Sequence, residues 1–176
     1  MKKDNAGISL VELLIVISIL AVLSGVGIYS FSQMSGYRAR ECSKKIATSI
    51  INNKVLTLGK AKSTGDICWE LYKNDGNYFV RTVRNAGSAS EYYEETEQVS
   101  KGKMDIFFFE SGSGGAVTQK QISDSQTLRF CFNRSSGAIC ASSSPYGLYK
   151  LTGIRVVTGQ RRYDIAIVPA TGKVVQ

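Results

Sequence analysis

The stretch ISLVELLIVISILAVLSGVGI, residues 8–28, decides how this chain is organised. Glu12 is its single charged residue, and every other residue in it is apolar, serine or glycine. As an α-helix the stretch would be about 31 Å long, which matches the hydrocarbon core of a bilayer at about 30 Å. We therefore expect a transmembrane helix over residues 8–30, because such a run has no polar face to present to water.

Two lysines precede the apolar run, as they would in a secretory signal peptide cut after Gly27. The carboxylate of Glu12 argues against that alternative. A charged residue at the centre of a membrane helix costs about 2.5–3.5 kcal/mol, and somewhat less near its end. A signal peptide that is removed has no use for a residue that makes membrane insertion less favourable. The carboxylate therefore indicates that this segment has a positively charged partner.

The residues around Glu12 form a recognisable pattern. A short basic leader ends in Gly7, and the apolar run starts at Ile8 with the glutamate four residues further on. This pattern resembles the prepilin processing site of type IV pilins and pseudopilins. The resemblance implies that a prepilin peptidase removes the leader, residues 1–7, by cutting between Gly7 and Ile8, and methylates the new N-terminus. It also implies that Glu12 compensates the charged amine of a neighbouring subunit in the filament core.

Physical chemistry supports a carboxylate–amine pair at this position. A lone carboxylate and a lone ammonium each pay a large desolvation cost in a low-dielectric filament core, and each is the best available partner of the other. A misaligned subunit would leave both charges buried without a partner. The pair would therefore set the register of assembly more than it would add net stability.

The resemblance further implies a role and a location. The chain would be a structural subunit of a type IV pilus (a fimbrium of the cell surface) or of a pseudopilus, serving adhesion, motility, secretion or DNA uptake. Its partners would be other pilin subunits, in a homo- or hetero-filament, and the prepilin peptidase. The precursor would be a single-pass protein of the cytoplasmic membrane with its head outside the cytoplasm, before assembly into an extracellular or envelope filament. Residues 161–175 are similar to the closing strand and hairpin of minor, pilus-tip-like pseudopilins.

A different class of protein is the alternative. The chain would then be a membrane-anchored or secreted β-rich surface domain that binds an extracellular ligand. In that case the apolar run is either a plain anchor or a signal that is removed after Gly27.

After Tyr29 the helical pattern continues but gains charged residues, so the helix becomes amphipathic. The stripe that we expect to be buried recurs at spacings of three and four, and is widened by three further apolar residues: Ala39, Cys42, Ile46, Ile50 and Asn53, with Ile51, Val55 and Leu58. A glycine at position 59 ends the pattern. We expect one helix from about Leu10 to about Leu58, whose second half, residues 31–62, packs on a head formed by residues 63–176.

Beyond residue 63 the hydrophobic period changes to two, which indicates β-strands. The predicted strands are residues 67–73, 78–84, 104–110, 127–133, 138–141, 149–158 and 161–169, with a short one near Lys173. The polar stretches 85–102 and 110–125 are expected to be long connections. The predicted fold class is therefore α+β: a long N-terminal helix, half transmembrane and half amphipathic, packed on an antiparallel sheet, as in the pilin fold.

Four cysteines in a head outside the cytoplasm favour disulfides. Cys131 and Cys140 lie symmetrically about the turn NRSSG, so adjacent antiparallel strands would bring them face to face. We expect that pair to bond, and Cys42 of the helix to bond to Cys68 of the first strand. Zinc is the alternative for four cysteines, but no two of them lie two to four residues apart, as structural zinc modules require. We predict neither a metal nor a cofactor.

Charge and composition limit the remaining functions. The chain has 22 Lys and Arg, 14 Asp and Glu, and no histidine, so Ser-His-Asp and Cys-His nucleophiles and histidine bases are excluded. With the resemblance, this favours a structural protein and no enzyme. Two basic groups would be candidates for DNA contact: Arg38, Arg40, Lys44, Lys45, Arg161 and Arg162. The acidic cluster is either solvated or meets a basic patch of a neighbouring subunit: Glu91, Glu94, Glu95 and Glu97.

Overall fold

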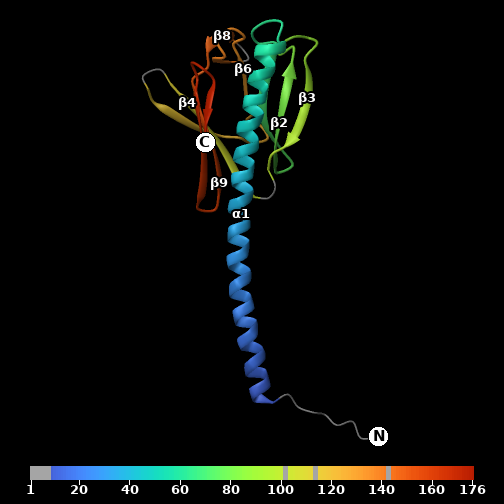
Figure 1. Ribbon diagram of the computed structural model, residues 1–176, viewed down its shortest axis with the longest axis vertical. Helices are drawn as coiled ribbons and strands as arrows, with labels where there is room; N and C mark the ends of the chain where they lie inside the picture. The colour runs from blue at the N-terminus through green and yellow to red at the C-terminus, as the bar shows by residue number, and fades with distance from the viewer. Residues whose placement is uncertain (1–8, 101–102, 113–114, 142–143) are drawn as a thin grey trace, which may run out of the picture. The chain divides into compact units, whose positions relative to one another are not determined.

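Figure 1 shows the computed structural model, which describes residues 9–100, 103–112, 115–141 and 144–176. The chain divides into two compact units, Met1–Ser35 and Gly36–Gln176, which we describe one at a time. The elements of the described residues are α1 (Leu10–Lys60), β1 (Ile67–Asn74), β2 (Asn77–Arg84), β3 (Tyr92–Gln98), β4 (Asp105–Ser111), β5 (Val117–Gln121), β6 (Leu128–Phe132), β7 (Ile139–Ala141), β8 (Ser144–Leu148), β9 (Leu151–Thr158), β10 (Arg161–Val168) and β11 (Lys173–Val175). The predicted α+β class and the predicted helix are confirmed.

The part of α1 that belongs to the second unit buries the predicted stripe. Its spacing of three and four places these side chains on one face, and each is at most 1% exposed: Ala39, Cys42, Ile46, Ile50 and Asn53. The expectation that Ile51, Val55 and Leu58 widen this stripe was wrong, because they are 47%, 63% and 44% exposed. Ile51 and Leu58 each follow a buried position by one residue, and Val55 follows Asn53 by two. Each residue turns the helix by about 100°, so these side chains point out of the core.

The strands of the second unit form two antiparallel sheets instead of the one expected. The first has the order β3-β2-β1-β6-β7-β8 and the second β11-β10-β9-β4-β5. The predicted strands correspond to β1, β2, β4, β6, β7, β9, β10 and β11, within two residues at each end. The stretches predicted as long connections contain β3 and β5, and β8 was not predicted.

The two extra edge strands have specific support. Register pairs Arg84 of β2 with Tyr92 of β3 and Phe107 of β4 with Gln121 of β5. All five residues of β5 are exposed, so this strand is held by its backbone ladder and by an ion pair between Lys120 and Glu110 at 2.6 Å. Such strands bury little apolar surface, and this is why hydrophobic alternation did not reveal them.

One hydrophobic core lies between α1 and both sheets, as the arrangement in Figure 1 shows. The sheet side is built mainly on aromatic and β-branched residues, including Trp69 of β1, Phe108 of β4 and Phe130 of β6. The rings of Trp69 and Phe130 lie 5.1 Å apart between centroids. Because Trp69 is fully buried, it reports directly on whether this core is intact.

The cysteine pairing differs from the prediction. Cys68 is bonded to Cys131, while Cys42 and Cys140 are free and buried, so the predicted bonds Cys131–Cys140 and Cys42–Cys68 are both corrected. Successive side chains of a strand point to opposite faces, so Cys68 lies on the face of β1 away from Trp69 and the core that contains Cys42. The helix thiol and the strand thiol therefore cannot meet.

Candidate functional site

The processing signal lies at the start of the first unit. Gly7 and Ile8, the predicted cleavage and methylation site, lie outside the described residues. The first helical hydrogen bond runs from the backbone N–H of Leu13 to the carbonyl of Ser9 at 3.0 Å. Glu12 lies in the first turn of α1, where a negative charge interacts favourably with the helix dipole. Ser9 and Glu12 also have the spacing of a capping box, a helix-start signal that the sequence reading did not use.

The helix of the first unit has an uncovered apolar surface. Its large apolar residues are 48–79% exposed: Leu10, Val11, Leu13, Leu14, Ile15, Val16, Ile17, Ile19, Leu20, Val22 and Leu23. The hydroxyls of Ser18 and Ser24 donate to the carbonyls of Leu14 and Leu20 at 2.8 Å and 2.7 Å, so they are satisfied within the helix. What this segment offers a partner is therefore apolar side chains and one carboxylate.

Within the described ranges, none of the helices reaches the length and apolarity needed to cross a membrane.

A glycine in α1 allows a close contact at the start of the second unit. A Cβ added at Gly36 would overlap the guanidinium of Arg161, which lies at the start of β10. Glycine in a helix interior costs about 1 kcal/mol relative to alanine, so its presence here is explained by this approach. The contact places a cation against the helix backbone.

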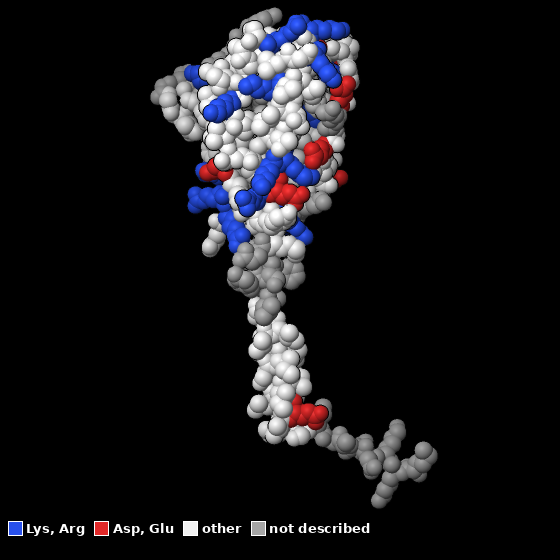
Figure 2. All heavy atoms as spheres, in the orientation of Figure 1, with Lys and Arg blue, Asp and Glu red and all other residues white. Residues whose placement is uncertain are grey.

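The six basic residues predicted to contact DNA do not share one environment. Lys45 pairs with Glu97 of β3 at 3.0 Å, Arg161 lies against Gly36, and Arg162 lines a cavity of about 520 Å³ beside Arg155. Arg38, Arg40 and Lys44 are exposed. Figure 2 shows Lys and Arg side chains spread over the visible face of the second unit. DNA contact stays a prediction.

The acidic cluster is neutralised within the chain. Glu94 accepts from Arg84 at 2.7 Å, Glu97 pairs with Lys45, and Glu91 pairs with Arg129 at 3.1 Å. These partners explain how an acidic segment can form strand β3. Each of these three carboxylates thus meets a cation of its own chain, while Glu94 and Glu97 remain partly exposed to solvent. Contact of the cluster with a basic patch of a neighbouring subunit stays a prediction.

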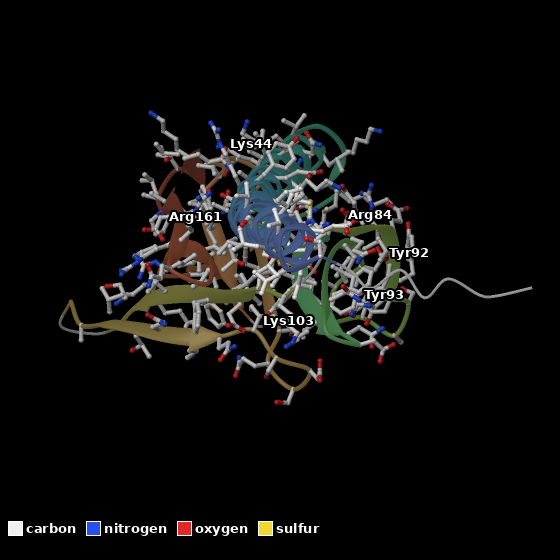
Figure 3. The ribbon with its side chains drawn as sticks, turned by 90° about the horizontal axis from the view of Figure 1, so that it is seen from below. Lys44, Arg84, Tyr92, Tyr93, Lys103 and Arg161 are labelled. Carbon is white, nitrogen blue, oxygen red and sulfur yellow. A yellow bond between two sulfur atoms is a disulfide. The ribbon has the colours of Figure 1, made fainter. Side chains whose placement is uncertain are left out.

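Three neighbours lower the pKa of the Glu91 carboxyl: Gly87, Arg129 and Tyr93. The largest cause is a hydrogen bond from the backbone N–H of Gly87 at 2.9 Å, and the charge of Arg129 adds to it. Figure 3 shows Arg84, Tyr92 and Tyr93 lying together on this side of the molecule, as their strand register requires. The ring of Tyr93 lies 3.6 Å from the guanidinium carbon of Arg81, so the edge strand is also held by a cation–π contact.

Sequence reasoning missed a buried charge cluster on the same face. Glu70 is 3% exposed and accepts from Arg81 at 2.5 Å and from Arg129 at 3.3 Å. Register places both arginines directly opposite Glu70, one on β2 and one on β6. The signal that would have found this cluster is strand pairing, since the three residues are far apart along the chain.

A polar groove of about 400 Å³ lies between α1 and strands β2 and β3. At its base Asn53, 1% exposed, donates through Nδ2 to the Cys68 carbonyl at 3.3 Å and to Thr82 Oγ1 at 3.2 Å. The carbonyl can only accept, which fixes Oδ1 as the atom that faces away from it. Among the protein atoms that the structure describes, this Oδ1 has no hydrogen-bond partner. A water molecule in the groove would satisfy it.

Comparison with known proteins identifies the N-terminal segment. Residues 2–28 match the family model of the prokaryotic N-terminal methylation motif. This match confirms the resemblance drawn from Gly7, Ile8 and Glu12. No curated protein and no solved structure matches the chain significantly.

Proposed function

We propose that this chain is a structural subunit of a type IV pilus or a related pseudopilus, because residues 2–28 carry the prepilin cleavage signal of type IV pilins and pseudopilins. The signal marks a pilin-like precursor that a prepilin peptidase processes and that is anchored in the membrane before assembly with other pilin subunits. The motif is that of a structural protein rather than a catalyst. This motif is the single observation that carries the proposal.

The finer steps follow from the position of the signal. Cleavage falls between Gly7 and Ile8, the new N-terminus is methylated, and Glu12 pairs with the amine of a neighbouring subunit. Residues 8–30 cross the membrane before assembly and form the filament core afterwards, while residues 31–62 pack on the head, residues 63–176, in a pilin fold. Support comes from the uncovered apolar surface of α1 in the first unit. Burying apolar surface between subunits contributes about 25 cal/mol per Å², and this free energy would drive filament assembly.

The N-terminus and intact mass of the protein from its own cells test the processing step. We expect a chain that starts at Ile8 and carries one methyl group. A start after Gly27 would make the apolar run a discarded signal, and a chain that retains Met1 would be a plain anchored domain. Either result overturns the proposal.

A matched pair of variants tests the assembly step. Glu12→Gln keeps the shape of the side chain but removes the charge, so we expect it to be cut after Gly7 and yet to be missing from sheared filaments. Glu41→Gln removes another carboxylate of α1, one that lies in the second unit, and is expected to assemble normally. Filaments of Glu12→Gln at wild-type yield would contradict the role of the carboxylate while leaving processing intact.

A further inference from the structure

Three of the four cysteines lie in one row across three adjacent strands. Register pairs Cys68 of β1 with Cys131 of β6, and Cys131 with Cys140 of β7. All three are at most 3% exposed and belong to one small hydrophobic cluster, with Val83 and Ala86, away from the main core. Cys131 therefore has a cysteine directly opposite it on each side.

The free thiol of this row is positioned beside the disulfide. The Sγ of Cys140 donates to the backbone carbonyl of Cys131 at 3.5 Å. Directly opposed residues of antiparallel strands have Cβ atoms about 4.5–5.5 Å apart, and a disulfide spans about 3.5–4.5 Å, so a small movement of one strand brings such a pair within bonding range. The strand that carries this thiol, β7, has only three residues and its register with β8 shifts between Cys140 and Ala141. Because β7 is short and only the edge strand β8 lies beyond it, these two strands can move with little loss of pairing.

We propose that Cys131 exchanges its disulfide partner directly between Cys140 and Cys68, and that Cys140 serves as the first partner during oxidative folding. The first bond forms when a small-molecule disulfide oxidises the thiols of Cys131 and Cys140 and is itself reduced to two thiols. In the forward step the Cys68 thiolate attacks Cys131 Sγ, the Cys131–Cys140 bond breaks, and Cys140 leaves as a thiolate. The proton that Cys68 gave up to solvent is balanced by the proton that Cys140 takes from it. The number of disulfides and thiols is unchanged, so the exchange itself needs no oxidant.

Chain length explains the order of the two bonds. Cys131 and Cys140 are nine residues apart, whereas Cys68 and Cys131 are 63 apart. Loop-closure probability falls with about the 3/2 power of loop length, so the short bond forms about 20-fold faster in an unfolded chain that is being oxidised. Once β1 pairs with β6, register brings Cys68 to the other side of Cys131 and the exchange can proceed.

The folded state then protects the product. Burial raises the pKa of the Cys140 thiol to about 11, so near neutral pH it is almost entirely protonated and a poor nucleophile. The back reaction therefore requires the edge around β7 to open. Cys42 provides a matched comparison, because it is also free and buried, and burial raises the pKa of its thiol to about 12, but it lies in the main core away from the row.

Oxidative refolding of the reduced full chain in detergent micelles tests the exchange. Samples taken during oxidation by oxidised glutathione are quenched with acid, and the thiols are blocked before digestion without reduction. Trypsin cleaves after Arg129, Arg134 and Lys150, which places Cys131 and Cys140 on separate peptides and makes each disulfide directly identifiable. The wild type is expected to form Cys131–Cys140 first and to convert to Cys68–Cys131.

Three variants sharpen the test. Cys140→Ser is expected to form Cys68–Cys131 about 20-fold more slowly than the wild type forms Cys131–Cys140. Cys68→Ser is expected to stop at Cys131–Cys140, and Cys42→Ser to follow the wild-type course. Acid-trapped wild-type intermediate, freed of glutathione and returned to pH 8, is expected to convert without added oxidant. The proposal is overturned if Cys68→Ser forms no Cys131–Cys140 bond while its Trp69 fluorescence is native. It is equally overturned if Cys140→Ser oxidises at the wild-type rate.

Discussion

Loss of the disulfide is predicted to remove a large part of the head's stability. The Cys68–Cys131 bond closes a loop with a sequence separation of 63 residues, and the chain-entropy relation gives about 4.3 kcal/mol for a loop of that length. We therefore expect Cys68→Ala/Cys131→Ala to lower the free energy of unfolding by about 4 kcal/mol. Domains of this kind have about 5–15 kcal/mol in total, so the variant would remain folded but marginal.

The single variant Cys68→Ala is predicted to lose much less. Cys131 can then bond to Cys140 across nine residues, and the same relation assigns about 2.6 kcal/mol to that shorter loop. The expected loss is therefore about 1.7 kcal/mol, and adding Cys140→Ala should restore the full loss. If the losses of unfolding free energy in Cys68→Ala and Cys140→Ala simply add in the double variant, this reasoning is contradicted, because no replacement bond then forms in Cys68→Ala.

Denaturant unfolding of the full chain in detergent micelles measures both values. Trp69 is the only tryptophan of the chain and is fully buried in the head, so its fluorescence follows unfolding of this unit. The disulfide state of each variant is checked by mass spectrometry before unfolding. A loss of less than about 1 kcal/mol in Cys68→Ala/Cys131→Ala would refute the loop-entropy account of this bond.

The remaining predictions concern charges and a helix glycine. Glu70→Gln leaves two arginines facing a neutral amide, so we expect the same assay to show that the free energy of unfolding falls by about 3 kcal/mol. Glu94→Gln breaks a more exposed ion pair, with Arg84, and is expected to lower it by less than about 1 kcal/mol. The folded-state pKa of Glu91 is lowered from 4.5, so its contribution is present above pH 4.5 and is lost as pH falls through the lower folded value. Glu91→Gln should therefore flatten the acid side of a plot of Tm against pH, and an unchanged slope would contradict this. Gly59→Ala should stabilise the chain by up to about 1 kcal/mol because nothing lies within 4 Å of its added Cβ, whereas Gly36→Ala should lose that gain by displacing the guanidinium packed against it. Equal gains for the two alanine variants would count against the contact.

The sequence predicted those parts of the fold whose burial follows one strong period. The stripe that runs from Ala39 to Asn53 repeats at three and four, and around Ile154 buried residues alternate in part with less buried ones. The edge strands β3 and β5 escaped prediction for a physical reason. Their side chains are charged or exposed, and what holds them is backbone pairing together with cations such as Arg84 and Lys120, which lie on other strands.

The sites were predictable to the extent that their chemistry is local. Gly7, Ile8 and Glu12 lie within six residues, and the matched methylation motif covers them. The disulfide was predicted wrongly because the hairpin argument placed Cys140 opposite Cys131 but took no account of the strand on the other side. Register with β1 is a long-range property, and it gives Cys131 a second directly opposite neighbour, Cys68.

The two units place different demands on their surroundings. In the second unit Glu94 and Glu97 of β3 and the buried Glu70 meet arginine or lysine of the same chain. In the first unit the apolar side chains are about half to four-fifths exposed, and Glu12 lies among them. Burying that surface against identical neighbours would also bury the carboxylate, which is tolerable only if a positive charge is buried with it. The amine that the proposed cleavage after Gly7 would release would supply such a charge four residues away, so on this proposal processing and assembly depend on the same few residues.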